Sequence, residues 1–220
     1  FNRLTGSRQK VANYAGVTVE RKEGSFVGPT RGERYRLLDL PGAYSLTPTT
    51  LDEAITRDCL LGRLAGESTP QRVICVVDAT NLRLNLRLVL ELRDLGVPMI
   101  VALNMSDLAQ SRGFGLDRER LERELGVPVV ETVAIRDGGE RALLQRLEGL
   151  PVPAGGPTTE WRESSFEQIQ QTQREVRRIL HAAGCPISPG ELKYGLGDKE
   201  CMLQMQKDHK AWWAGERDKW

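Results

Sequence analysis

The sequence has few aromatic residues, almost no net charge and no long hydrophobic run. Aromatic residues make up 5% of the 220 residues, and the formal net charge is +1. Residues 151–220 carry ten basic and ten acidic side chains, so the balance hides no basic segment. Nucleic-acid binding usually requires such a basic region, and we therefore expect no nucleic-acid partner.

Cysteine is also sparse, and no CxxC pair occurs among Cys59, Cys75, Cys185 and Cys201. A chain of this length does not need disulfide bonds to fold, so we expect reduced thiols in a cytosolic compartment. No apolar run approaches the roughly 20 residues of a membrane-spanning helix. Phe1 is not a methionine and reads as the inside of a helix, which indicates a piece of a longer protein.

The clearest pattern is an alternation of strands and helices. Residues 73–77 and 99–103 are continuous apolar runs, typical of strands buried on both faces, and 127–130 predicts a third. Such alternation predicts an α/β fold with a doubly wound, mostly parallel sheet. Capping residues, helical periodicity and terminal glycines place the helices. The expected helices cover about 51–60, 81–95, 117–126, 140–147 and 164–183.

The two ends of the chain are less regular. Residues 7–16 predict a loop, and 17–20 with 34–38 predict an antiparallel hairpin at a sheet edge. Residues 150–157 are rich in proline and glycine. We therefore predict a first domain at 1–150, a linker at 151–157 and a small C-terminal α-helical domain at 158–220. Thr50 with Glu53, and Ser164 with Glu167, predict capping boxes.

Two strands of the predicted sheet end in polar residues. Asp39-Leu40-Pro41-Gly42 follows the strand at 34–38, and Asn104-Met105-Ser106-Asp107 follows the one at 99–103. Alone, Asp-x-x-Gly is equally typical of a plain strand end before a turn. At the carboxyl edge of an α/β sheet, however, Asp39 could reach a magnesium ion through water and the Gly42 N–H could meet a phosphate. The Asp107 carboxylate can accept two hydrogen bonds from guanine, which adenine cannot donate.

These motifs, with several others, resemble the cytosolic GTPase domain of the bacterial ferrous iron transporter B family. The likeness covers about residues 1–150, and its most specific block is Asn13-Tyr14-Ala15-Gly16-Val17-Thr18-Val19-Glu20. The other matching segments are Phe1-Asn2-x-Leu4-Thr5-Gly6, Asp39 to Leu46, Leu51-Asp52-Glu53, Val77 to Leu82 and Ala102 to Asp107.

The resemblance implies a P-loop GTPase-type fold, GTP and GDP as ligands, and magnesium as cofactor. It makes Thr18 the switch I threonine, which contacts magnesium and the terminal phosphate, and makes Asp39 and Gly42 the switch II elements. Asn104 and Asp107 would select guanine, and the loop at Val133 and Ala134 would meet the guanine carbonyl. The backbone carbonyls of Ala12 and Tyr14 would contribute to a potassium site.

Two departures from the family pattern affect the expected activity. The family's first strand and phosphate loop precede the helix in which Phe1 lies, so the given sequence does not include them. Ala43 stands where many GTPases carry a water-positioning glutamine, which predicts slow hydrolysis.

By the resemblance, the protein is a regulatory GTPase at the cytoplasmic face of the bacterial inner membrane. Its expected partners are a guanine nucleotide, the membrane iron-channel domain of the same protein and a further copy in a homo-oligomer. Residues 158–220 take the place of the family's helical domain. Two alternatives stay open: a ribosome-assembly or RNA-associated GTPase, and a catalytically inactive interaction module that keeps the fold.

Overall fold

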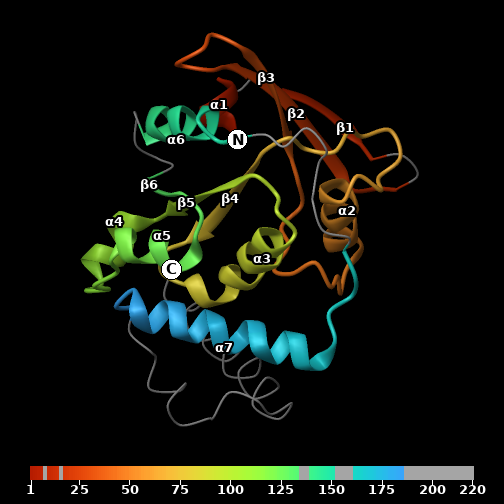
Figure 1. Ribbon diagram of the computed structural model, residues 1–220. Helices are drawn as coiled ribbons and strands as arrows, with labels where there is room; N and C mark the ends of the chain where they lie inside the picture. Colours follow the sequence, from red (N-terminus) through yellow and green to blue (C-terminus); the bar gives the residue numbers. More distant parts are fainter. Residues whose placement is uncertain (7–8, 15–16, 134–138, 152–160, 186–220) are drawn as a thin grey trace, which may run out of the picture. The chain divides into compact units, whose positions relative to one another are not determined.

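The computed structural model describes residues 1–6, 9–14, 17–133, 139–151 and 161–185 (Figure 1). The chain divides into two compact units, residues 1–185 and 186–220. Residues 186–220 of the C-terminal domain predicted at 158–220, including Cys201, lie outside the described residues, as does most of the predicted linker. The boundaries predicted at 150 and 158 therefore remain predictions.

The first three strands form an antiparallel sheet in the order β1-β2-β3. The strands are β1 (Gln9–Asn13), β2 (Glu20–Val27) and β3 (Arg34–Asp39). The prediction of a loop at 7–16 was thus wrong, because β1 lies within it. The predicted antiparallel hairpin is confirmed in the pairing of β2 with β3, but its first strand begins at Glu20 and β1 adds a third strand. Strand β1 was missed because Lys10 to Asn13 are all exposed and Val11 is the one large apolar side chain among them, which leaves no apolar alternation in the sequence. Residues 17–19 lie before β2 and not in it.

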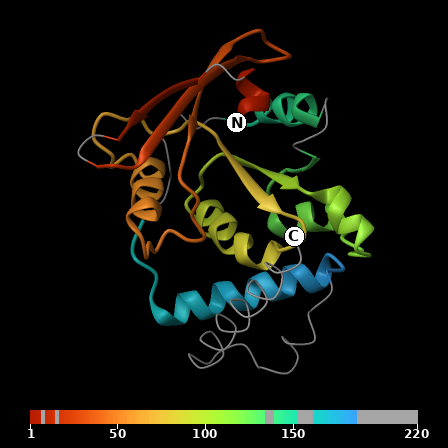
Figure 2. The ribbon, with the colours of Figure 1, turned by 180° about the vertical axis from the view of Figure 1, so that it is seen from behind.

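A second sheet is parallel, in the order β4-β5-β6, as the apolar runs predicted. Its strands are β4 (Val73–Asp78), β5 (Met99–Asn104) and β6 (Val129–Thr132). Side chains of β5 alternate between two hydrophobic clusters, with Val101 in one and Ile100 in the other. This sheet is therefore covered on both faces, and the layers are visible from the front and from behind (Figures 1 and 2).

Seven helices accompany the strands in the described part of the chain. The larger cluster includes residues of α3 and α5, and the smaller cluster includes residues of α6. The short α4 was not predicted. The helices are α1 (Asn2–Thr5), α2 (Leu51–Leu60), α3 (Leu82–Asp94), α4 (Ser106–Ser111), α5 (Arg118–Leu125), α6 (Gly139–Glu148) and α7 (Phe166–Ala182).

Local capping explains most helix limits. The Asp117 side chain accepts a hydrogen bond from the Arg120 N–H at the start of α5, and Gly126 ends this helix in the left-handed conformation. The predicted capping box at Ser164 was displaced by one residue, because Ser165 and Gln168 bond reciprocally instead. Gln168 can serve because its amide oxygen accepts from the Ser165 N–H as a carboxylate would.

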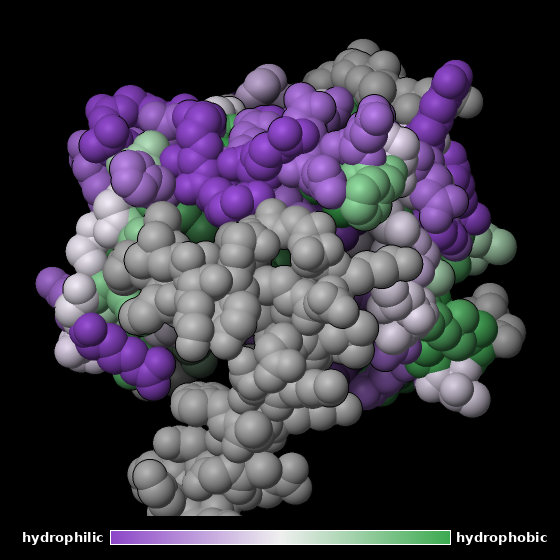
Figure 3. Space-filling view, turned by 90° about the horizontal axis from the view of Figure 1, so that it is seen from below, coloured by the Kyte–Doolittle hydropathy of each residue, from purple (hydrophilic) through white to green (hydrophobic). Residues whose placement is uncertain are grey.

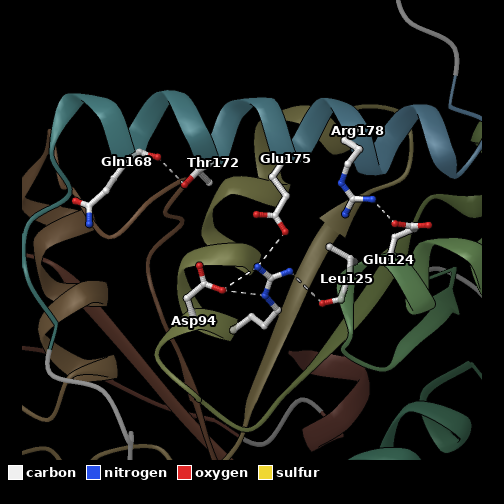
Figure 4. Close-up of polar contacts among 8 residues, drawn as sticks. Asp94, Glu124, Leu125, Gln168, Thr172, Glu175 and Arg178 are labelled. Carbon is white, nitrogen blue, oxygen red and sulfur yellow. Dashed lines mark hydrogen bonds and ion pairs between the residues drawn. The ribbon is translucent and has the colours of Figure 1, made fainter.

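Helix α7 packs against α3 and α5. Its buried side chains, among them Ile179, belong to the same hydrophobic cluster as α3 and α5. Ion pairs flank this contact. Arg93 Nη2 lies 3.1 Å from the Glu175 carboxylate, and Arg178 Nη1 lies 2.5 Å from the Glu124 carboxylate (Figure 4). Seen from below, the surface outside the grey atoms is mainly hydrophilic (Figure 3).

The segment that leads into α7 is held by Trp161. Guanidinium groups of Arg57 and Arg63 lie 5.5 and 5.2 Å from the centre of its indole ring. Arg57 belongs to α2 and Arg63 follows that helix. These cation–π contacts therefore connect the start of the C-terminal part to the end of α2.

No helix among the described residues is long and apolar enough to cross a membrane.

Candidate functional site

The residues predicted to read guanine lie where β5 ends and α4 begins. Asn104 is the last residue of β5, and Met105 follows with φ 59°, a left-handed conformation that turns the chain sharply into α4. Asp107 lies in the first turn of α4, where its carboxylate accepts a hydrogen bond from the Leu108 N–H at 2.9 Å. A carboxylate has about four acceptor positions, and the Leu108 N–H takes up one of them.

The neighbouring strand brings Val133 to the same edge. Asn104 lies opposite Thr132 in the β5–β6 ladder, and the Ser106 hydroxyl donates to the Thr132 carbonyl at 3.4 Å. Asn104 and Val133 both line a cavity of about 160 Å³. Its other walls include Phe1, Arg3, Leu4, Ile74, Val76, Ala102, Thr132, Glu140 and Leu143. Ala134 lies outside the described residues.

On the β4 side of this cavity, one strand edge is open among the described residues. No described strand pairs with β4 on the side away from β5. Val76, in the middle of β4, is 66% exposed although its neighbours Cys75 and Val77 are buried. Val76 lines the cavity, so its exposure marks a part of this face of the sheet that no other described element covers.

The Asp39–Gly42 loop follows β3 and is tied to the helices around it. The Thr56 hydroxyl of α2 donates to the Pro41 carbonyl at 2.6 Å. Further along the loop, the Leu46 N–H donates to the Glu91 carboxylate of α3 at 2.5 Å. Side chains of two helices thus hold this segment at Pro41 and at Leu46, while Gly42 between these two contacts is exposed.

The buried carboxylate of Glu53 holds the last turn of this loop. It accepts from the Thr49 N–H and hydroxyl, both at 2.8 Å. Burial alone would raise the pKa of the Glu53 carboxyl, but these hydrogen bonds outweigh it and hold the pKa below its usual value. The Thr50 hydroxyl accepts from the Glu53 N–H, which is the side-chain half of the predicted capping box.

Gly42 is not required by its own surroundings. A Cβ built there would meet no described atom within 4 Å, and its φ is not positive. Neither crowding nor backbone strain in the described structure therefore explains glycine at this position. Close approach of a ligand to a bare backbone N–H is the remaining common reason for such a glycine.

Thr18 lies in the turn between β1 and β2, where it is exposed. The Val17 N–H donates to the Tyr14 carbonyl at 3.2 Å, and the Tyr14 N–H donates to the Val19 carbonyl at 3.1 Å. Ala12 lies inside β1, opposite Arg21 of β2. The carbonyl of Tyr14 thus has one acceptor position in use by the turn and one remaining.

The side chain of Tyr14 was not predicted to have a role, yet it connects two candidate segments. It is 3% exposed, and its hydroxyl donates to the Asp39 carbonyl at 3.4 Å. Burial, with help from the nearby Cys59 and Glu67, raises the pKa of this phenol to about 12. Tyr14 and Asp39 are 25 positions apart in sequence. The one sequence signal for this contact is that Tyr14 is aromatic, since a large aromatic side chain tends to be buried.

The predicted residues therefore form two groups. Asn104, Asp107 and Val133 lie at the carboxyl ends of β5 and β6. Tyr14 contacts Asp39 beside the antiparallel sheet, and Thr18 lies in the turn that follows Tyr14. The described residues contain no group of three or more His, Cys, Asp or Glu side chains that could hold a metal ion by themselves. The Thr18 hydroxyl and the Asp39 carboxylate are, however, the hard oxygen donors that magnesium prefers.

Comparison with known proteins identifies the family. Residues 1–147 match the family model described as "Ferrous iron transport protein B". The "Fe(2+) transporter FeoB" of Salmonella typhimurium is 49% identical over 147 residues, which are 65% of this chain and 18% of that protein. The corresponding protein of Escherichia coli K12 is 48% identical over the same length. The chain thus spans about a fifth of the length of these curated relatives.

Solved structures agree with this assignment. The cytosolic domain of T. maritima FeoB in GMPPNP form matches 94% of this chain and 79% of that chain, with a TM-score of 0.61 and 35% identity. The G domain alone from T. maritima matches 67% and 86% of the two chains, with a TM-score of 0.58 and 40% identity. The P-loop GTPase-type α/β fold predicted from the sequence is thereby confirmed. The chain belongs to the ferrous iron transport protein B family, and its first 147 residues are part of that family's N-terminal G domain.

Proposed function

We propose that this chain is the guanine-nucleotide-binding regulatory part of a ferrous iron transporter. GTP binds at the carboxyl edges of the strands, is hydrolysed slowly, and the resulting motion of the two switch loops is passed to a membrane iron channel. The observation that carries this proposal is the placement of Asn104 and Val133 on one cavity, at the strand end that leads into Asp107.

Each group of candidate residues has a separate task in this proposal. The Asp107 carboxylate accepts two hydrogen bonds from the guanine base, and Asn104 supports the loop around it. At the other end, the Gly42 N–H donates to the terminal phosphate, where no Cβ obstructs its approach. Val133 and Ala134 supply backbone groups for the guanine carbonyl.

Magnesium fits the donors present: the Thr18 hydroxyl would hold it directly and Asp39 through a water. When bound, it neutralises charge that develops on the transferred phosphoryl group. A potassium ion held by the carbonyls of Ala12 and Tyr14 would add positive charge nearby. Ala43 offers no polar side chain to orient the attacking water, which is why we expect slow hydrolysis.

The proposal extends to the whole protein. Residues 158–220 act as the helical regulatory domain between nucleotide site and membrane, at the cytoplasmic face of the inner membrane, and copies associate as a homo-oligomer. The near-zero net charge does not favour an RNA-associated GTPase. An inactive interaction module is the alternative that nucleotide binding itself tests.

The test replaces one carboxylate oxygen of Asp107 by an amide NH2 group. In the full-length protein, Asp107→Asn should weaken GTP binding and favour xanthosine triphosphate, because xanthine presents an acceptor where guanine has its amino group. Competition against a fluorescent guanine nucleotide measures both affinities. Loss of one charged hydrogen bond predicts a decrease of about 2 kcal/mol, or roughly 30-fold in GTP affinity.

Asp117→Asn is the matched control, since it makes the same chemical change at the start of α5, where asparagine also caps a helix well. It should leave both affinities unchanged. GTP affinity in Asp107→Asn equal to that of the wild type would remove Asp107 from the base site. A wild-type protein that binds no guanine nucleotide would leave only the interaction module.

A further inference from the structure

Four charged side chains form a closed ring beside the antiparallel sheet. Glu67 lies in the loop between α2 and β4. Its carboxylate accepts hydrogen bonds from Arg21 Nε and from Arg36 Nη2, the second at 2.6 Å. The Glu23 carboxylate pairs with the same two arginines: it contacts Arg21 Nη2, and it lies 3.2 Å from Arg36 Nε. Cations and anions therefore alternate around the ring, and its net charge is zero.

The ring joins the strands that lead to the two candidate loops. Arg21 is the second residue of β2, three positions after Thr18. Arg36 is in β3, three positions before Asp39. Backbone pairing already holds β2 and β3 side by side. Because Glu67 bonds an arginine of each strand, it ties this strand pair to the loop that follows α2.

Burial makes this contact more than an exposed surface ion pair. The side chains of Glu67 and Arg21 are 7% and 17% exposed. Burial alone would raise the pKa of the Glu67 carboxyl, but hydrogen bonds from Arg21 and Arg36 keep it below its usual value. A neutral residue at position 67 would leave Glu23 as the remaining carboxylate of the ring for both arginines. The loss costs more at Arg21, which is 17% exposed, than at Arg36, which is 45% exposed.

Tyr14 adds a second connection on the side of the loops. Its hydroxyl donates to the Asp39 carbonyl, and its N–H donates to the Val19 carbonyl, so it links the Thr18 turn to the start of the Asp39 loop. Glu67 is close enough to Tyr14 to contribute to its raised pKa. The ring and Tyr14 thus both make contacts that connect the Thr18 turn with the Asp39 loop.

We propose that Glu67 is a positioning residue of the nucleotide site: by holding Arg21 and Arg36, it fixes the β2–β3 pair against the loop that follows α2, so that Thr18 and Asp39–Gly42 reach the terminal phosphate together. This rests on the proposed function. GTP touches both loops through that phosphate, whereas GDP lacks it and is held by its base and remaining phosphates. Glu67 should therefore affect GTP binding and not GDP binding.

The experiment measures affinities of the full-length protein for fluorescent GDP and for a fluorescent non-hydrolysable GTP analogue. Glu67→Gln should lower affinity for the GTP analogue about tenfold and leave GDP affinity unchanged, a typical coupling between two sites. Arg36→Lys keeps the charge but cannot bridge Glu67 and Glu23 with a planar fork, so it should give a smaller shift in the same direction. It also serves if Glu67→Gln fails to fold.

Glu33→Gln is the matched control. Glu33 is an exposed glutamate of the β2–β3 turn, pairs with the Tyr35 hydroxyl and lies outside the ring, so both affinities should match the wild type.

Equal losses for GDP and the GTP analogue in the ring variants would show a merely structural role and overturn the inference. Affinities for both nucleotides that equal those of the wild type, in both ring variants, would also overturn it. A wild type that binds neither nucleotide would overturn the proposed function as well.

Discussion

Helix α7 shares its core with the parallel sheet, which makes a quantitative prediction about Ile179. This side chain is 0% exposed and packs in the cluster that also contains Leu90 and Leu125. Ile179→Ala removes three buried carbon atoms and leaves a cavity, which should cost about 3 kcal/mol. In a chain of this size, this corresponds to a fall in melting temperature of roughly 6–12 °C.

The assay is urea denaturation of the chain followed by circular dichroism. If α7 is part of one cooperative unit with α3 and α5, the whole helical signal should shift to lower urea in a single transition. Phe166→Ala is the control, because Phe166 lies in the same helix but is 67% exposed and should change stability by less than about 0.5 kcal/mol. Equal midpoints for both variants, or a separate early transition of α7 alone, would refute the reasoning.

Two further predictions concern the loops and acid stability. Thr18→Ala in the full-length protein should leave GDP affinity intact and lower the hydrolysis rate at least tenfold; a normal turnover rate would contradict the role of Thr18. The pKa of Glu67 is held below its unfolded value of about 4.5, so its stabilisation is complete above that pH and is lost as the pH falls through the folded pKa. Glu67→Gln should therefore flatten the acid limb of unfolding free energy against pH, and parallel limbs would disprove it.

Features that depend on nearby residues could be predicted from the sequence. The limits of α5 follow from Asp117 and Gly126, each of which acts on its own helix end. The apolar run of β5 required burial on both faces, which the two hydrophobic clusters provide. The polar end of β5 could be assigned to a ligand edge because carboxyl ends of parallel strands share that edge in α/β folds. Asp39 ends β3, which lies in the antiparallel sheet, so the same argument does not place it.

Features that join distant segments could not. The ring needs Glu67 beside Arg21 and Arg36, which are 46 and 31 positions away in sequence, and charges alternate equally well on ordinary solvated surfaces. The contact of Tyr14 with Asp39 depends on how a turn folds back over 25 residues. Strand β1 is held mainly by its backbone pairing with β2, so its side chains carried no pattern to read.

The placement of Trp161 has an optical consequence. Its indole contacts two guanidinium groups, one from α2 and one from the turn that follows, so its fluorescence depends on where that helix ends. Trp161 is the one tryptophan of the described residues; the others are Trp212, Trp213 and Trp220. A form with phenylalanine at those three positions would carry a built-in spectroscopic reporter of α2, the helix whose Thr56 holds the Asp39–Gly42 loop.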